Sequence, residues 1–168
     1  MNKTHAKKEN KMATPRVTKV VVNAGIGRIL NQSKNQKETL DDVARLFSLL
    51  SGQKPKIVLS NKSIATFKLR KGMPVGLKAT LRGVRARDFM TRLVNLALPR
   101  VRDFRGIEHS TISTNSLSIG FKEFNVFPEV INENAKAPFS LQVVVVSTTD
   151  KKEDAQAFFE SLGVRFKK

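Results

Sequence analysis

Residues 75–82, VGLKATLR, alternate strictly between apolar side chains and polar or small ones. A period of two is that of a β-strand, whose successive side chains point to opposite faces of a sheet. One face of this strand is apolar and the other is basic, because Val75, Leu77, Ala79 and Leu81 alternate with Gly76, Lys78, Thr80 and Arg82. We therefore expect a sheet with one face covered by protein and the other left open.

Strand and helix patterns interleave irregularly in the rest of the chain. Further strands are expected at residues 17–23, 53–60, 63–69, 117–121 and 141–147, the last as a continuous apolar run typical of a strand buried on both faces. Helices are expected at residues 36–51, 85–98 and 150–162. This order predicts an α+β fold: a largely antiparallel sheet, helices packed on one face, and an exposed basic face with a protruding hairpin loop.

Each expected helix carries a signal for its ends or its buried side. Gly52 is placed to end the first helix, and Pro99 to end the second. Asp150 and Glu153 form a capping-box-like pair at the start of the third. The residues expected to face inward in the first two share helical spacing: Leu40, Val43, Phe47 and Leu50, then Phe89, Leu93, Leu96 and Ala97.

The chain is expected to form one domain behind a flexible arm. Residues 1–16 are polar, lysine-rich and without apolar periodicity, whereas residues 17–168 are long and apolar enough to bury a core. No apolar run is as long as a membrane span, and the first residues lack the hydrophobic centre of a signal peptide. With no cysteine, disulfides and thiolate metal sites are excluded. We expect a soluble, cytoplasmic protein.

Positive charge is concentrated in the middle of the chain. The formal net charge is +17, and residues 43–87 hold eleven Lys or Arg but no Asp or Glu. A solvated surface normally mixes both signs, so this one-sided segment indicates an anionic partner. Nucleic acid, a membrane surface and an acidic protein are all negatively charged and are the candidate partners. No basic amphipathic helix of the membrane-binding type is present, which favours nucleic acid.

The sequence GMPVG, residues 72–76, lies between two expected strands and predicts a turn. An ordinary hairpin explains its glycines and Pro74. It does not explain why Lys68, Arg70 and Lys71 cluster beside the turn. The sharper hypothesis is a protruding basic finger that contacts RNA.

The sequence NAGIGR, residues 23–28, places a Gly-x-Gly after a strand, as dinucleotide-binding folds do. It lacks the third glycine, and no lone acidic residue follows at the distance expected of a ribose-binding carboxylate. Instead, Gly25 and Gly27 either let the backbone approach RNA or let the chain turn, with Asn23 presenting its amide. No His, Asp or Glu grouping suggests acid–base catalysis or a metal site.

Five stretches occur together in an order and spacing that are specific: KVVVNAGIGR, SGQKP, KSIATFKLRKGMPVGLKATLRG, LALPRVRDFRG and IGFKEFNVFPE. Through them, over residues 17–163, the chain resembles the bacterial family of large-subunit ribosomal protein number five, the 5S-rRNA-binding family. The resemblance implies a structural RNA-binding protein, with no catalytic role, cofactor or metal.

The family resemblance also implies partners and sites. Members bind 5S rRNA with the exposed sheet face and adjoining turns, join it to the large rRNA in the central protuberance, and reach P-site tRNA with the hairpin loop. They also touch a small-subunit head protein. The positions matching rRNA contacts are Asn23, Gln53 and Thr80, to which charge and strand parity add Lys54, Lys78 and Arg82. The tRNA-contact loop comprises Arg70, Lys71, Gly72, Met73 and Pro74.

Three regions depart from the family pattern. A helix with aromatic residues usually precedes the first strand, where this chain has its lysine-rich arm. The loops at residues 110–115 and 132–139 lack family motifs, so no site is assigned there. Two other functions remain open from the residues: an RNA chaperone working away from the ribosome, and an enzyme with a phosphorylated substrate.

Overall fold

The fold is built on one antiparallel sheet of five strands in the order β2-β3-β1-β5-β4. The computed structural model describes residues 14–102, 104–131, 133 and 138–167, so most of the expected arm at residues 1–16 lies outside it. The strands are β1 (Val17–Gly25), β2 (Lys56–Leu59), β3 (Pro74–Arg82), β4 (Ser116–Phe121) and β5 (Ser140–Ser147). The predicted α+β class and the antiparallel sheet are confirmed.

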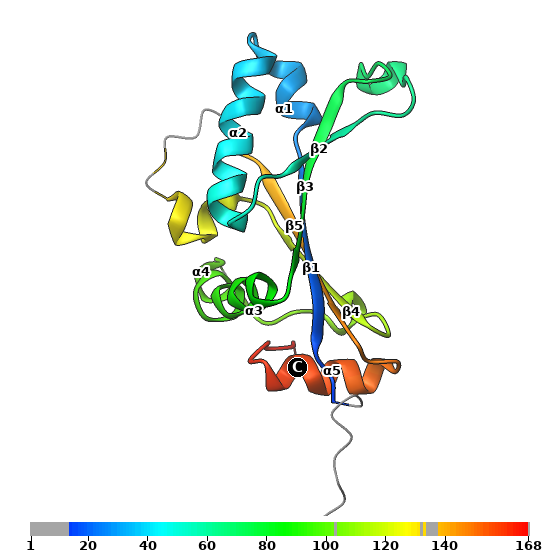
Figure 1. Cartoon of the computed structure of the whole chain (residues 1–168), viewed down its shortest axis with the longest axis vertical. Coiled ribbons are helices and arrows are strands. Elements are labelled where there is room, and N and C mark those ends of the chain that lie inside the picture. Colours follow the sequence, from blue (N-terminus) through cyan, green and yellow to red (C-terminus); the bar gives the residue numbers. More distant parts are fainter. Residues whose placement is uncertain (1–13, 103, 132, 134–137, 168) are drawn as a thin grey trace, which may run out of the picture.

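Helices cover one side of this sheet, as Figure 1 shows for α2, α3 and α4. A short helix α1 (Gly27–Gln32) precedes α2 (Gln36–Ser51), which has the predicted bounds and ends at Gly52 with the left-handed φ of 65° that glycine adopts readily. Helix α3 (Val84–Arg92) continues through a π-helical turn (Leu93–Ala97) into α4 (Leu98–Arg100). Helix α5 (Lys152–Ser161) lies at the far end of the sheet in Figure 1.

Alternation along the strands builds the core. In β1, β3 and β4, every second side chain is buried beneath the helices, including Val22, Leu81 and Ile119. From the helix side, Phe89 of α3 stacks on Phe127 with ring centroids 5.8 Å apart. The alternation predicted for residues 75–82 and 117–121 is therefore confirmed, and it leaves the opposite sheet face without a helix layer (Figure 1).

The segment between β2 and β3 differs from the prediction. The sequence predicts a strand at residues 63–69, but they fold into a short 3₁₀ turn (Ala65–Phe67) closed by a bridge between Ile64 and Leu69. Residues 60–73 thus form one long hairpin loop, and Pro74 is the first residue of β3. Figure 1 shows this loop projecting beyond the sheet.

Two predicted helix signals were wrong. The helix predicted at 85–98 does not stop before Pro99 but continues to Arg100, because a π-helical turn precedes the proline and shifts the hydrogen-bond pattern. The same wider turn rotates Leu96 outward to 41% exposure, while Leu93 and Ala97 stay buried. The Asp150–Glu153 capping box does not form, because α5 begins at Lys152 without a side-chain cap.

Strand β5 is not buried on both faces. Its odd-numbered residues are buried, but Gln142 is exposed and Val144 and Val146 are only half-buried. The strand does have a neighbour on each side, β1 and β4. The apolar run therefore marks its place inside the sheet, whereas its second face lies on the open side.

Candidate nucleic-acid interface

The side of the sheet away from the helices, called here the open face, contains no carboxylate from any strand, because none of the five strands has an Asp or Glu. Strand register and alternation assign to it four basic residues: Lys19, Lys56, Lys78 and Arg82. In the described part of the chain, none of the four forms an ion pair. The open face is thus a cationic surface.

Two like-charged pairs lie directly opposite each other on this face. Lys56 of β2 pairs with Lys78 of β3, and Lys19 of β1 pairs with Arg82 of β3. Like charges directly opposite in an antiparallel pair destabilise a sheet. An anion bound across the strands would relieve both repulsions, which points to a partner with closely spaced negative charges.

Polar groups lie beside the cations. Asn23 in β1 has Lys78 on one side and Gln142 of β5 on the other. Thr80 lies opposite Val21, and both are half-buried. The face therefore offers amides and a hydroxyl for directional hydrogen bonds next to cations that attract phosphate.

Gly25 marks a shallow hollow at one end of the open face. It lies opposite Gly76 and Ser140, and the hollow is lined by residues that include Asn23, Ser140 and Gln142. A Cβ atom at Gly25 would meet nothing within 4 Å, so the backbone there is bare toward the outside. A ligand can approach the backbone closely at this point.

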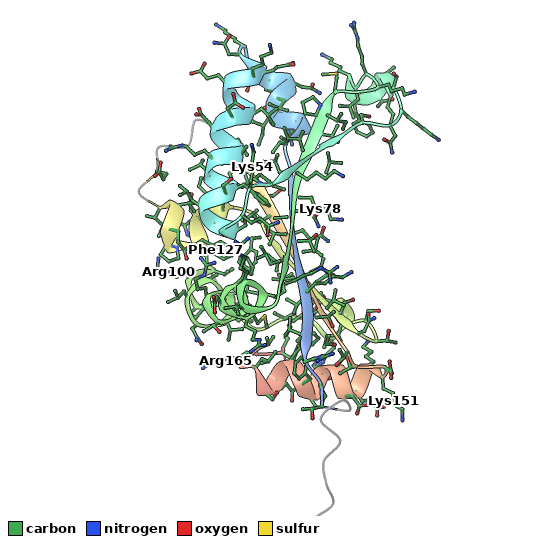
Figure 2. The ribbon with its side chains drawn as sticks, viewed as in Figure 1. Lys54, Lys78, Arg100, Phe127, Lys151 and Arg165 are labelled. Carbon is green, nitrogen blue, oxygen red and sulfur yellow. The ribbon has the colours of Figure 1, made fainter. Side chains whose placement is uncertain are left out.

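Gln53 and Lys54 precede β2 and border the sheet rather than standing on the strands. Figure 2 labels Lys54 near α2, whereas Lys78 lies on the side of the strands away from the helices. The Gln53 carbonyl accepts a hydrogen bond from Ser51 Oγ at 2.8 Å, and its side-chain Oε1 accepts one from Arg85 Nη1 at 3.5 Å. Gln53 is therefore held at the junction of α2, β2 and α3.

The predicted tRNA-contact residues lie where the 60–73 hairpin joins β3, and Pro74 already belongs to that strand. Arg70, Lys71 and Gly72 are exposed, while Met73 and Pro74 are half-buried. Gly72 has a φ of 87°, and its N–H donates to the Ser60 carbonyl at 2.9 Å, closing the base of the loop. The two cations therefore stand on a backbone that is already ordered.

The sequence interpretation missed several open-face residues. Lys19 has the same strand parity as Asn23, so alternation in residues 17–23 could have found it. Gln142 and Ser140 were missed because the neighbouring valines suggested a strand buried on both faces. Gly120 of β4, opposite Gln142, was missed because a glycine has no side chain to mark its face. Lys56 was missed because all four residues of its short strand are exposed, so no alternation marks the two faces.

In the described residues, the carboxylates lie in helices and loops and not in the strands. Two ion pairs tie the helices to the segment after β4: Arg45 to Glu133 at 2.7 Å and Arg92 to Glu129 at 2.6 Å. The described residues contain no cluster of three or more metal-ligating side chains. Nor does the described chain contain a helix with the length and apolarity to cross a bilayer.

Comparison with known proteins is consistent with this surface. A family model described as Ribosomal protein L5 matches residues 10–70, and a second model, for the C-terminus of the same ribosomal family, matches residues 74–166. "Large ribosomal subunit protein uL5" of Syntrophomonas wolfei is 44% identical over 160 residues, covering 95% of this chain and 88% of that protein. The protein of the same name from Thermus aquaticus is 40% identical over 161 residues, covering 95% and 86%.

Proposed function

Because the chain belongs to the L5 (uL5) family of ribosomal proteins, a structural and non-enzymatic component of the large ribosomal subunit, we propose that its open face binds 5S rRNA. By this contact it joins 5S rRNA to the large rRNA in the central protuberance. The 60–73 hairpin reaches P-site tRNA, and a small-subunit head protein is a further neighbour. The protein works in the cytoplasm as part of the ribosome.

One observation carries the proposal: the paired cations on a sheet face whose five strands contain no Asp or Glu. Lys56 opposite Lys78, and Lys19 opposite Arg82, destabilise the free protein and favour a bound polyanion. A folded RNA supplies closely spaced phosphates, and binding them releases counterions. The sheet is preorganised, so little conformational entropy is lost on binding.

The site residues divide into two roles. Lys78 and Arg82 supply affinity through phosphate contact, which depends on salt. Asn23 and Thr80 supply directional hydrogen bonds to bases or ribose hydroxyls, which distinguish one RNA from another. Gly25 admits the RNA close to the backbone, and Gln53 and Lys54 extend the contact past the sheet edge.

The test is a filter-binding titration with 5S rRNA and an unrelated RNA of equal length over a range of salt. Preference for 5S rRNA should persist as salt rises, because shape and hydrogen bonds are less screened than charge. Thr80→Val should reduce the preference and leave the salt dependence unchanged, whereas Arg82→Ala should lower the salt slope by about one phosphate contact. Equal affinity for the two RNAs at every salt concentration would contradict the proposal.

A further inference from the structure

Phe67 is the exposed phenylalanine in a chain whose other phenylalanines are covered. All eleven phenylalanines lie in the described residues, and the other ten are buried or half-buried. The Phe67 side chain is 65% exposed, and no ring of the described chain stacks on it. The chain has neither Trp nor Tyr, so no other large aromatic side chain offers such a surface. One exposed apolar side chain is common on a protein surface, so the ordered backbone and the charges around Phe67 decide what its ring can contact.

The backbone beneath Phe67 is fixed. Ile64 and Leu69 exchange two N–H···O hydrogen bonds, of 3.0 and 3.1 Å, that close the turn at the hairpin tip. Asn31 Nδ2 of α1 donates to the Phe67 carbonyl at 3.1 Å and ties the tip to the body of the protein. The ring is thus held outside the molecule by an ordered turn, which is the condition for binding with little entropy loss.

Lys68, next in the chain, adopts a left-handed conformation with a φ of 51°, the one positive φ of a non-glycine residue in the described chain. Its N–H donates to the Ala65 carbonyl at 2.9 Å. A strained conformation held in place by hydrogen bonds is typical of functional sites. It closes the turn directly after Phe67 and so fixes the direction of the chain there.

The charges around the ring select the class of partner. Lys62, Lys68, Arg70 and Lys71 share the loop with Phe67 and are exposed, and residues 43–87 contain no acid. An aromatic ring among cations matches a nucleobase that is flanked by phosphates. In a duplex the base faces are stacked on each other, so the base must be unpaired or unstacked, as in an RNA loop.

We propose that Phe67 stacks on an unpaired nucleobase in a loop of a folded RNA, while the cations of the hairpin hold the adjoining phosphates. The inference rests on the proposed function, in which the hairpin contacts RNA, and it names the group that is recognised. Stacking tolerates different bases, because every base has a π-face. The tip is therefore selective for loop structure and not for base sequence.

The direct test uses the absence of tryptophan. Phe67→Trp places a single fluorophore at the tip, and Val84→Trp places one at a site that is 68% exposed on α3, away from the hairpin. Each variant is saturated with an RNA stem-loop or with a continuous duplex of equal length, and saturation is checked by filter binding. Stacking should quench the fluorescence of Phe67→Trp with the stem-loop far more than with the duplex, whereas Val84→Trp should respond equally to both. Equal responses at position 67, or none, overturn the proposal.

Affinity gives a second, independent readout. Phe67→Ala should weaken stem-loop binding about 5- to 150-fold, the range seen when a base-stacking ring is removed. Phe67→Tyr should bind like the wild type, and Phe67→Leu should bind like Phe67→Ala, because leucine keeps apolar area without a π-face. A leucine variant with wild-type affinity overturns stacking.

The outcomes of these tests can be separated from those for the proposed function. The open face lies on the sheet, so Phe67→Ala should leave the affinity for 5S rRNA unchanged. If preference for 5S rRNA is absent while the indole at position 67 is still quenched by the stem-loop, only the 5S proposal fails. If 5S rRNA binds selectively and that indole is not quenched, only this inference fails.

Discussion

The two faces of the sheet are made from the same strands but differ in burial and in charge. On the covered face, apolar side chains such as Val22 and Leu81 are fully buried under the helices. On the open face, Lys19, Lys78 and Arg82 stand on those strands with no ion-pair partner in the described residues. The difference teaches that alternate positions of one strand can serve stability and binding separately, since a substitution at one parity hardly changes the other face.

The largest effect should come from neighbouring valines of β1. Val22→Ala removes two methyl groups from a fully buried site and should lower the free energy of unfolding by about 2–3 kcal/mol. Val21→Ala, on the half-buried open face, should lower it by about 1 kcal/mol or less. Urea unfolding of both variants checks this, and equal losses would erase the distinction between the faces.

A smaller effect is expected within the helix layer. Arg92→Ala removes the ion-pair partner of Glu129, whose Oε2 is already buried without a described partner. The free energy of unfolding should fall by about 1–3 kcal/mol. Arg45→Ala breaks a more exposed pair and should cost about 0–1 kcal/mol. Thermal unfolding at low and high salt compares them; a larger loss for Arg45→Ala would reverse the expected order.

Neutralising the open face should affect binding and hardly affect folding. Lys78→Gln should change the free energy of unfolding by no more than about 0.5 kcal/mol, and relief of the repulsion from Lys56 favours an increase. The same variant should lower the salt slope of 5S rRNA binding by about one contact. Lys151→Gln, outside the open face, is the control. A slope change of equal size in the control would show that only total charge matters.

The smallest stability change is expected at Gly25, where a substitution should affect RNA binding and not folding. Gly25→Ala should leave unfolding within about 0.5 kcal/mol of the wild type, because the new Cβ has nothing within 4 Å. It should nevertheless weaken 5S rRNA binding, since the methyl group projects where RNA is proposed to approach the backbone. Unchanged RNA affinity would remove Gly25 from the interface.

Local patterns determined much of the fold. The alternation at residues 75–82 predicted both faces of β3, and helical spacing with Gly52 predicted the bounds of α2. These predictions worked because each pattern reports directly on burial along one element. The basic face followed from them, because Lys78, Thr80 and Arg82 share one strand parity.

Other features depend on contacts between distant residues. The sequence at 63–69 alternates like a strand, but its backbone hydrogen bonds close locally between Ile64 and Leu69. Leu96 has helical spacing with Phe89, yet the π-helical turn moves it outward. The sequence did not show which side of β5 is open, because Val143 and Val144 are the same residue type. Residue type alone cannot say which of the two is buried and which lies on the open face.

Strand order has a consequence for biosynthesis. β1 precedes the other four strands in the chain and lies at the centre of the sheet, between β3 and β5, whereas β5 is the last of the five strands to be made. A nascent chain that has left the ribosome only as far as β4 therefore exposes the valine-rich edge of β1, a template for unwanted association. The sheet is complete only when β1 pairs with β5, which is far away in the sequence, and such long-range pairing slows folding. Chaperone protection during synthesis should matter most in that interval.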